Sequence, residues 1–366
     1  MLKVGLIGCG NISETYFRSQ TYFNNINIVT CADISIEAAN KCAQEYNIQV
    51  KNVDDLLADK EIDIILNLTN PISHYETIKK TLLSNKHSYC EKPLSISFEQ
   101  GKELVELANS KKLYLGNAPD TFLGGGGQLT KKIIDSGEVG DIKLGNFFFA
   151  FPGVNPWHPN PEPWFIEGGG PVLDMGPYYF TALVNMLGPV ESVSAMVSRS
   201  GDRIATSDAM KGQILPVEVN THVTGLLKFK SGPIITCAMS FDVFCHECPH
   251  IQIHGTEGSM TVPDPNTFQG PVKLAKSNKE GFEELPYYTV YHNNWRSLGV
   301  ADMAESLNED YPHRASGKLA YHVLDVMLSL EESAEQKKEL EVKSTCKRPL
   351  AMPASKLTGS SLTTKV

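Results

Sequence analysis

Residues 3–13 read KVGLIGCGNIS, an apolar run that leads directly into a Gly-x-Gly turn and then into a stretch that can form a helix. Glycines at positions 8 and 10 allow the backbone to turn tightly and to approach a pyrophosphate, whose charge the amide groups and dipole of the helix start then hold. Ser13 stands where such turns carry a third glycine, and it is small enough for close helix–strand packing. The alternative is a structural strand–helix turn without a ligand. We predict a dinucleotide site formed by Gly8, Gly10, Asn11 and Ile12.

The first third of the chain alternates short apolar runs with amphipathic stretches, the pattern of repeated strand–helix–strand units and a parallel sheet. The predicted strands are residues 3–7, 26–32, 62–68, 88–90 and 113–116. The predicted helices are residues 35–46, 73–85 and 97–110. We therefore expect a doubly wound α/β domain over residues 1–120, with ligands bound at the carboxyl ends of its strands.

After the glycine run at 124–127 and a short predicted helix ending at Ser136 and Gly137, the pattern changes to long strands without intervening helices. Turns such as Lys230-Ser231-Gly232-Pro233 separate them, which predicts a second domain over residues 121–366 with a large, mostly antiparallel sheet. The predicted strands are residues 142–151, 190–198, 219–230, 233–244, 250–255 and 286–292. Two helices are predicted within this domain, at 171–187 and 314–336.

The composition is that of an ordinary globular protein of two domains: 366 residues, 41% hydrophobic and 20% charged, with a formal net charge of −9. The negative charge argues against nucleic acid and anionic membrane as partners. No apolar run approaches the length of a membrane span. The eight cysteines have no framework spacing and several lie in apolar runs, so we expect them to pack as small apolar residues in a reducing, cytoplasmic compartment.

Asp33 closes the second predicted strand, where an acidic side chain accepts hydrogen bonds from the ribose hydroxyls of the adenosine. A 2'-phosphate would meet this carboxylate as a like charge, and neither Ile34 nor Ser35 supplies a cation to hold it. The alternative role of Asp33, a helix N-cap, is better assigned to Ser35 with Glu37 in the first turn. The predicted cofactor is therefore NAD rather than NADP.

Lys92 lies in Cys90-Glu91-Lys92-Pro93, directly after the strand at 88–90. Pro93 restricts the preceding residue to extended or turn conformations, which places Lys92 at the carboxyl end of that strand. Removal of a hydride from an alcohol needs a base near the hydroxyl, and a lysine serves once burial and neighbouring charge lower its pKa toward neutrality. The alternative for any lysine is an ordinary surface position.

Five segments together resemble the Gfo/Idh/MocA family, named after glucose-fructose oxidoreductase, inositol dehydrogenase and rhizopine catabolism. The resemblance covers nearly the whole chain. The segments are Gly8-Cys9-Gly10, Thr69-Asn70-Pro71 with His74, Glu91-Lys92-Pro93, residues 168–176 (GGGPVLDMG) and residues 313–317 (HRASG). The resemblance implies an N-terminal Rossmann domain, a second domain whose open sheet face joins subunits into a homodimer or homotetramer, and an NAD-dependent oxidoreductase.

The resemblance also implies roles for single residues. Lys92 contacts the reacting hydroxyl, and Glu91 lies near the nicotinamide ribose. The family's glycine-rich helix carries Asp and usually His four residues later, and this chain has Asp174 and Tyr178. That spacing puts both on one helix face, where they orient the substrate and help the proton leave. Tyrosine also occurs at the second position in some branches of the family, and because a phenol titrates less readily near neutrality, Lys92 carries more of the acid/base role.

The remaining candidate ligand contacts are weaker. Thr69 and Asn70 are expected to border the nicotinamide, with His74 either beside them or as a packing residue. Substrate contacts are predicted for Asn117, Trp157 and His313, with loop packing as the alternative for Trp157.

Cys245-His246-Glu247-Cys248 suggests zinc ligands, but there is no second Cys-x-x-Cys and strand alternation would separate the two thiols. We predict no metal.

The sequence thus predicts hydride transfer between NAD and a secondary alcohol of a sugar, glycoside or polyol. Three alternatives stay open: a trans-dihydrodiol dehydrogenase-like reductase, an enzyme that retains NAD while cleaving or epimerising glycosides, and a non-catalytic NAD-sensing regulator.

Overall fold

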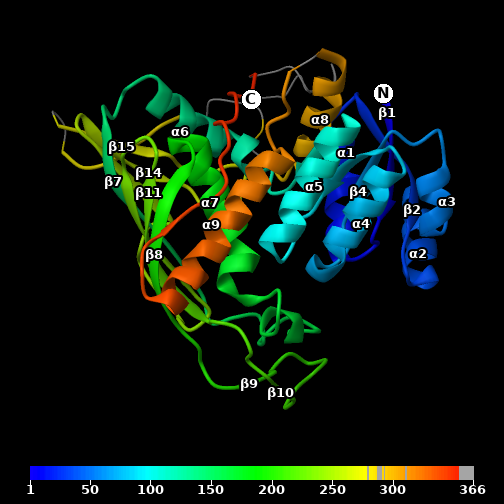
Figure 1. Ribbon diagram of the computed structural model, residues 1–366, viewed down its shortest axis with the longest axis horizontal. Coiled ribbons are helices and arrows are strands. Elements are labelled where there is room, and N and C mark those ends of the chain that lie inside the picture. Colours follow the sequence, from blue (N-terminus) through cyan, green and yellow to red (C-terminus); the bar gives the residue numbers. More distant parts are fainter. Residues whose placement is uncertain (278–279, 287–290, 292, 310, 354–366) are drawn as a thin grey trace.

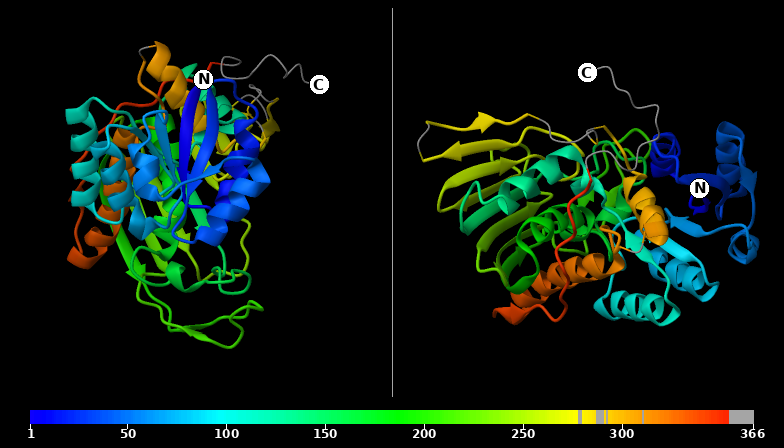
Figure 2. Two further views of the ribbon diagram at one scale, coloured as in Figure 1. Left: turned by 90° about the vertical axis from the view of Figure 1, so that its right-hand side faces the viewer. Right: turned by 90° about the horizontal axis from the view of Figure 1, so that it is seen from above.

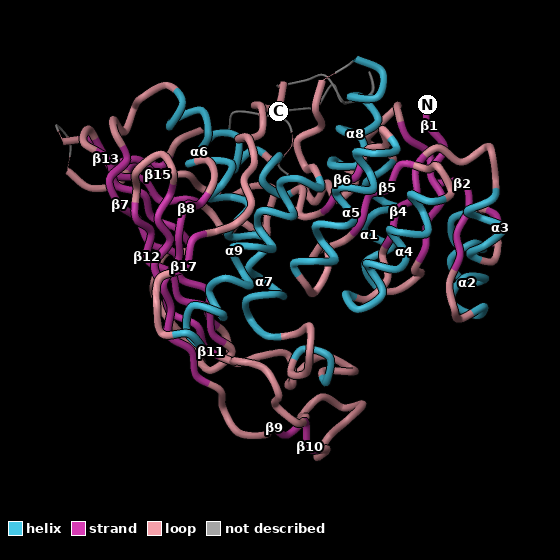
Figure 3. The backbone as a smooth tube through the Cα atoms, viewed as in Figure 1, coloured by secondary structure: helices cyan, strands magenta, loops and turns pink. Residues whose placement is uncertain are grey.

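The computed structural model describes residues 1–277, 280–286, 291, 293–309 and 311–353. Two sheets dominate it, one in each half of the chain (Figure 1). The N-terminal sheet and its helices lie on one side of the molecule, and the larger sheet forms the other side (Figure 3). Long helices from the second half lie between them, so the two halves meet over helices rather than sheet against sheet.

The N-terminal sheet has six parallel strands in the order β3-β2-β1-β4-β5-β6. The strands are β1 (Leu2–Ile7), β2 (Ile26–Ala32), β3 (Gln49–Val50), β4 (Ile64–Asn67), β5 (His87–Cys90) and β6 (Leu115–Asn117). The helices are α1 (Asn11–Gln20), α2 (Ile36–Tyr46), α3 (Val53–Ala58), α4 (Pro71–Leu83) and α5 (Phe98–Lys111). The order reverses between β1 and β4, which is where doubly wound sheets bind ligands. The predicted doubly wound fold is confirmed, while the short β3 and α3 were not predicted.

Local sequence signals explain why these helices begin where they do. Ser35, Asn52, Asn70 and Ser97 each accept a backbone N–H of the following first turn, as N-caps do. Strand β1 is buried on both faces, as its adjacent residues Leu6 and Ile7 show, because helices cover each side of the sheet (Figure 2, left).

The second sheet has nine strands in the order β16-β15-β14-β13-β7-β12-β11-β8-β17, antiparallel except for the parallel pair β7 and β12. Its strands are β7 (Ile142–Ala150), β8 (Val190–Ser198), β11 (His222–Phe229), β12 (Ile234–Ser240), β13 (Ile251–Gly255), β14 (Gly258–Val262), β15 (Lys273–Lys276), β16 (Glu283–Glu284) and β17 (Leu340–Glu341). A separate hairpin joins β9 (Arg203–Ile204) to β10 (Ile214–Leu215). The large, mostly antiparallel sheet is as predicted.

Helices cover one face of this sheet: α6 (Gly125–Asp135), α7 (Gly170–Leu187) and α9 (Gly317–Gln336) (Figure 1). Short 3₁₀ turns stand at Thr121–Leu123 and Glu162–Trp164. No described helix packs on the other face, which is open in both Figure 1 and Figure 2. In β11, burial alternates strictly along the strand, as expected for a sheet with one covered face.

The last part of the chain returns to the N-terminal domain. Helix α8 (Leu298–Glu309), which was not predicted, packs on α1, and α9 packs on both α5 and the second sheet. Ser316 caps α9 through its side chain, so this helix starts at Gly317 and not at the predicted 314. The predicted strand 233–244 ends at Ser240. Within the predicted strand 286–292, residues 287–290 and 292 lie outside the described residues.

None of the helices within the described ranges is long and apolar enough to cross a membrane.

Candidate active site

The glycine turn lies at the switch point between β1 and β4. Gly8 has φ +102°, and a Cβ there would lie 2.6 Å from the backbone carbon of Leu68, so a side chain would collide with the end of β4. A Cβ at Gly10 would meet nothing within 4 Å. The backbone conformation therefore requires glycine at position 8, and there is open space beside position 10.

The start of α1 next to this space has the properties of a phosphate site. Gly10 is its N-cap, so no side chain satisfies the first amide groups of the helix. The Asp33 carboxylate accepts from the backbone N–H of Cys9 at 2.7 Å and of Ser35 at 2.8 Å. These contacts leave lone pairs for further donors, because a carboxylate accepts about four hydrogen bonds. The residues present fit a dinucleotide.

The loop after β4 lies against the glycine turn. Thr69 donates through its N–H and its hydroxyl to the side-chain oxygen of Asn67, and Asn70 caps α4. His74 is fully buried, and its ring nitrogens lie 2.9 Å from the carbonyl oxygen of Thr69 and 2.6 Å from that of Pro93. His74 thus joins the loop after β4 to the loop that carries Lys92, and its predicted place beside the nicotinamide stays a prediction.

Lys92 meets Asp174 across the boundary between the two domains. Its Nζ donates to the Asp174 carboxylate Oδ1 at 2.8 Å and to the Asp174 backbone carbonyl at 2.6 Å. Both side chains are mostly buried, with 17% and 18% exposed. Lys92 reaches this position from the end of β5, whereas Asp174 lies in the first turns of α7, so the pair exists only in the folded chain.

The protonation of Lys92 differs from the expectation drawn from the sequence. Burial alone lowers the pKa of this ammonium, but the negative charge of Asp174, with Tyr178 and Glu91, outweighs the burial and raises it above its ordinary value. The predicted shift toward neutrality is therefore wrong for the structure without ligands. The reason is that Asp174 contacts Lys92 directly, which a reading along the chain did not anticipate.

Tyr178 lies one turn after Asp174 on the same face of α7, as predicted. Nζ of Lys92 lies 5.3 Å from the centre of its ring. On the other side, Nη1 of Arg296 donates to the Tyr178 hydroxyl at 3.1 Å. Because a guanidinium only donates, the Tyr178 oxygen is the acceptor and its own hydrogen stays available for another partner.

Arg296 is a site residue that sequence reasoning missed. It is buried, and its Nη2 also donates to the side-chain oxygen of Asn266 at 2.8 Å. Buried guanidinium groups keep their charge and are retained where paired donors are needed. No sequence signal marked it, because only the folding of the segment before α8 onto α7 brings Arg296 to Tyr178.

A second buried group holds Glu91 and the backbone around it. Glu91 accepts from the hydroxyl of Tyr16 at 2.8 Å, a residue that the sequence also did not single out. Asn117 is buried and donates to the carbonyl oxygens of Cys90 and Glu91 at 3.0 and 2.9 Å. Asn117 therefore positions the lysine loop from behind, and the structure offers no support for the predicted substrate contact.

Asp120 adds a buried titratable group near Glu91. Burial raises the pKa of Asp120 to about 7. The positive charge of Arg296 opposes this shift, and the negative charge of Glu91 adds to it. One carboxylate oxygen accepts from the Gly299 N–H at 2.8 Å, which ties this position to the start of α8.

Two predicted substrate residues do not join this group. His313 lies against the carbonyl of Leu115 and the ring of Tyr114, and its pKa is lowered by burial. These contacts are at the amino end of β6, whereas Lys92 follows the carboxyl end of β5, so the expected contact of His313 is not supported. Trp157 is 63% exposed, and its ring meets that of His158 edge to face in the loop before α7.

The fold and these residues together define a class of protein: a dinucleotide-binding domain that carries a lysine at its strand ends, paired there with an aspartate from a second domain. Residues 2–118 match the family described as oxidoreductase family, NAD-binding Rossmann fold, and residues 128–261 match the GFO/IDH/MocA C-terminal domain. The chain belongs to the Gfo/Idh/MocA family of oxidoreductases, and its N-terminal domain is an NAD-binding Rossmann domain.

Curated relatives support the same family. An uncharacterized oxidoreductase of Schizosaccharomyces pombe is 31% identical over 254 residues, which are 67% of this chain and 64% of that protein. The chain thus spans slightly less than two thirds of this relative. A 1,5-anhydro-D-fructose reductase of Ensifer adhaerens is 25% identical over 78% of this chain and 83% of its own, and an inositol 2-dehydrogenase of Rhizobium meliloti is 23% identical over 79% and 83%.

Among solved structures, levoglucosan dehydrogenase in complex with NADH and L-sorbose superposes with a TM-score of 0.82. It is 20% identical, and the match covers 94% of this chain and 99% of that one. At this identity the likeness shows the shared fold.

Proposed function

We propose that the protein transfers a hydride between NAD and a secondary alcohol of a sugar, glycoside or polyol, with Lys92 as the acid/base. The observation that carries the proposal is the contact of Lys92 with Asp174 beside Tyr178, at the strand ends of an NAD-binding domain. Gly8, Gly10, Asn11, Ile12 and Asp33 would hold the cofactor, with Thr69, Asn70 and Glu91 near the nicotinamide. NAD, when bound, supplies the carbon that accepts or releases the hydride.

The raised pKa of Lys92 favours the acid role in the protein without ligands. In the reduction of a ketone, the ammonium gives one proton to the carbonyl oxygen as hydride arrives at the carbonyl carbon. In the oxidation of an alcohol, Lys92 first loses that proton and then takes the one from the hydroxyl as hydride leaves the same carbon. Because Asp174 stabilises the protonated form of Lys92, the fraction of neutral Lys92 that can act as a base increases with pH, and so should the rate of oxidation.

The polarity of the site supports a substrate with several hydroxyl groups. Lys92, Asp174, the Tyr178 hydroxyl and Arg296 lie within one connected set of contacts, and each offers a hydrogen-bond donor or acceptor. An apolar ring would offer none of these groups a further hydrogen bond, whereas a ligand with several hydroxyl groups offers both donors and acceptors. The relatives named for inositol and anhydrofructose act on polyhydroxylated molecules, in keeping with this class of substrate.

The open face of the large sheet supports a proposed homodimer or homotetramer. Leu144, Met196, Leu226 and Ile234 are exposed on neighbouring strands, and Leu144 and Ile234 lie directly opposite one another in the register of β7 and β12. Apolar side chains grouped on a face without a helix are typical of a subunit interface. Light scattering of the purified protein measures the assembly, and a monomer at all concentrations would contradict it.

The test of function is NADH formation by the purified protein with NAD, and separately NADP, over inositols, hexoses, alkyl and aryl glucosides and a trans-dihydrodiol. The reverse assay follows NADH consumption with the corresponding ketoses. Turnover of a sugar or polyol with NAD supports the proposal. Turnover of the dihydrodiol alone would replace it with the apolar-substrate alternative, and NAD binding without any turnover would favour a retained cofactor or a regulator.

A further inference from the structure

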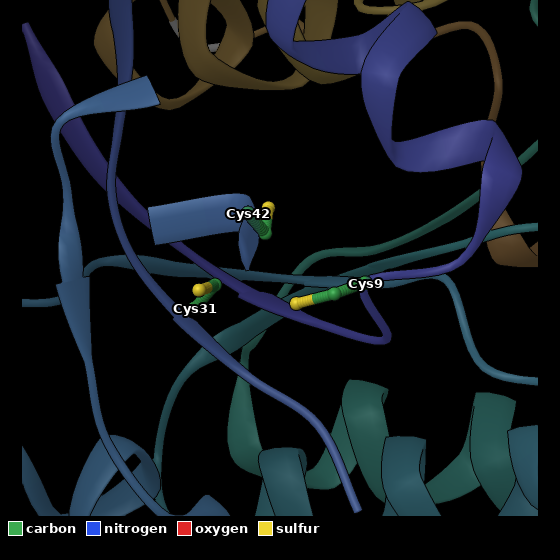
Figure 4. Close-up of side chains that lie close together, drawn as sticks. All are labelled: Cys9, Cys31 and Cys42. Atoms are coloured by element: carbon green, nitrogen blue, oxygen red, sulfur yellow. The ribbon is translucent and has the colours of Figure 1, made fainter. Parts of the chain in front are cut away.

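Three cysteines that are far apart in the sequence meet beneath the glycine turn. Cys9 belongs to the turn between β1 and α1, Cys31 to β2 and Cys42 to α2, and all three are free thiols. Their sulfur atoms all lie within 4.8 Å of one another (Figure 4). The sequence predicted scattered thiols that pack as small apolar residues, and the fold instead gathers three of them.

The surroundings of the group combine burial of two thiols with partial exposure of the third. Cys31 and Cys42 are buried and Cys9 is half-buried. The sulfur contacts to backbone oxygens are long: 3.8 Å from Cys9 to Ala32 and 3.5 Å from Cys31 to Ala39. The contacts of Cys9 and Cys31 are therefore weak competitors for a metal ion, and Cys9 is the member of the group that is partly exposed.

We propose that Cys9, Cys31 and Cys42 form a binding site for a soft, thiophilic metal cation. Such a cation bonds to thiolate sulfur at about 2.3 Å, as zinc does, which sets three sulfurs around one ion about 4 Å apart. The sulfurs already lie within 4.8 Å of one another, so binding requires each to move by less than about 1 Å. Each thiol releases its proton to solvent on binding. Hard cations such as Mg²⁺ prefer oxygen ligands and are excluded by the donor set.

The position of the site couples it to the cofactor turn. The backbone N–H of Cys9 donates to Asp33 at 2.7 Å, and Cys9 stands between Gly8 and Gly10. A metal that draws the Cys9 sulfur toward α2 ties this turn to a second element and disturbs its contact with Asp33. We therefore expect metal binding to weaken NAD binding, and by thermodynamic reciprocity NAD to weaken metal binding by the same factor.

The experiment titrates the full-length protein with Cd²⁺ under a phosphine reductant, and measures bound metal by equilibrium dialysis. Cys245 and Cys248 are exposed and are replaced in every sample by Cys245→Ser and Cys248→Ser. The test variant adds Cys42→Ala. The matched control adds Cys237→Ala, which removes an equally buried thiol from β12 in the other domain. Circular dichroism verifies that each variant is folded.

We expect one Cd²⁺ per chain in the background protein and in the Cys237→Ala control, and at least a tenfold loss of affinity in Cys42→Ala. The intensity of the sulfur-to-cadmium charge-transfer absorption in the background protein should correspond to three thiolates, a readout that holds even where Cys42→Ala does not fold. Binding that survives Cys42→Ala, or a spectrum of fewer than three thiolates, overturns the site. NADH affinity that is equal with and without Cd²⁺ overturns the coupling.

Discussion

Replacement of Asp174 by asparagine tests how the proposed site holds its proton. The Asp174 carboxylate accepts from Lys92 at 2.8 Å, and less than a fifth of either side chain is exposed. Asparagine keeps the shape and one oxygen acceptor, but it removes the negative charge that raises the pKa of Lys92. Burial then acts with less opposition, and the lysine loses its proton at lower pH.

The size of the effect follows from the distance. Two opposite unit charges about 3 Å apart, at an effective dielectric constant of about 20, interact by on the order of 5 kcal/mol. One pKa unit corresponds to about 1.4 kcal/mol, so this interaction sets an upper limit of roughly four units. Glu91 and Tyr178 remain beside Lys92 in the variant. We therefore expect a fall of on the order of two units in the pKa of Lys92.

The assay is the pH dependence of kcat/KM for alcohol oxidation with a substrate found by the panel above. In the unchanged protein this rate should rise with pH across the neutral and mildly alkaline range, because the ammonium must first lose its proton. In Asp174→Asn the rise should level off about two pH units earlier, whatever the change in absolute rate.

The matched control is Asp242→Asn, the same substitution in the ion pair with Arg203 in the second domain. Its pH profile should equal that of the unchanged protein. An Asp174→Asn profile that coincides with that of the unchanged protein would refute the reasoning, because the Asp174 carboxylate would then not raise the pKa of Lys92.

Three further results are expected. Lys92→Ala should lower turnover about a hundredfold or more while NAD binding stays nearly intact. The control Lys86→Ala removes a buried lysine that donates to backbone carbonyls away from the site, and the folded variant should keep its turnover. A Lys92→Ala variant as active as the unchanged protein would contradict the mechanism. Asp33→Ser should weaken NADH binding by about tenfold or more and narrow the preference over NADPH in fluorescence titrations, and an unchanged ratio would contradict the role of Asp33. Asp120 has a folded pKa of about 7 against an ordinary value of 3.8, so its stabilising contribution is present below the ordinary value and is lost as pH rises through 7. Asp120→Asn should therefore be more stable than the unchanged protein above neutral pH, by up to on the order of 4 kcal/mol in urea unfolding, with the difference shrinking toward acidic pH; parallel stability curves would contradict this.

Much of the fold followed from local pattern. The predicted strand 26–32 coincides with β2, and the predicted helix 171–187 differs from α7 by one residue, because apolar runs and glycine or proline stops are strong local signals. The short β3 and α3 and the helix α8 escaped prediction. Their stability comes mainly from packing on neighbours, as for α8 on α1, and short segments carry weak periodicity of their own.

The candidate site was predictable in part. Lys92, Asp174 and Tyr178 stood in motifs whose resemblance to a family suggested their roles, and the structure brings these three together. Arg296 and Tyr16 were missed, because each reaches the site through packing between distant segments. For the same reason the predicted substrate contact of His313 was not borne out by the fold. His313 lies at the amino end of β6, whereas Lys92 follows the carboxyl end of β5.

The sequence alone determined the glycine turn, the longer strands and helices of the N-terminal domain, the acidic residue at the end of β2 and the lysine after β5, because each depends on residues that are neighbours along the chain. Only the tertiary structure decided which charges meet. The contact of Asp174 with Lys92 reverses the direction in which burial alone would move the lysine pKa, and the packing of α2 on β2 gathers three thiols from separate elements. Electrostatic and metal-ligand chemistry act over a few ångströms in space, so they depend on distances that only folding establishes.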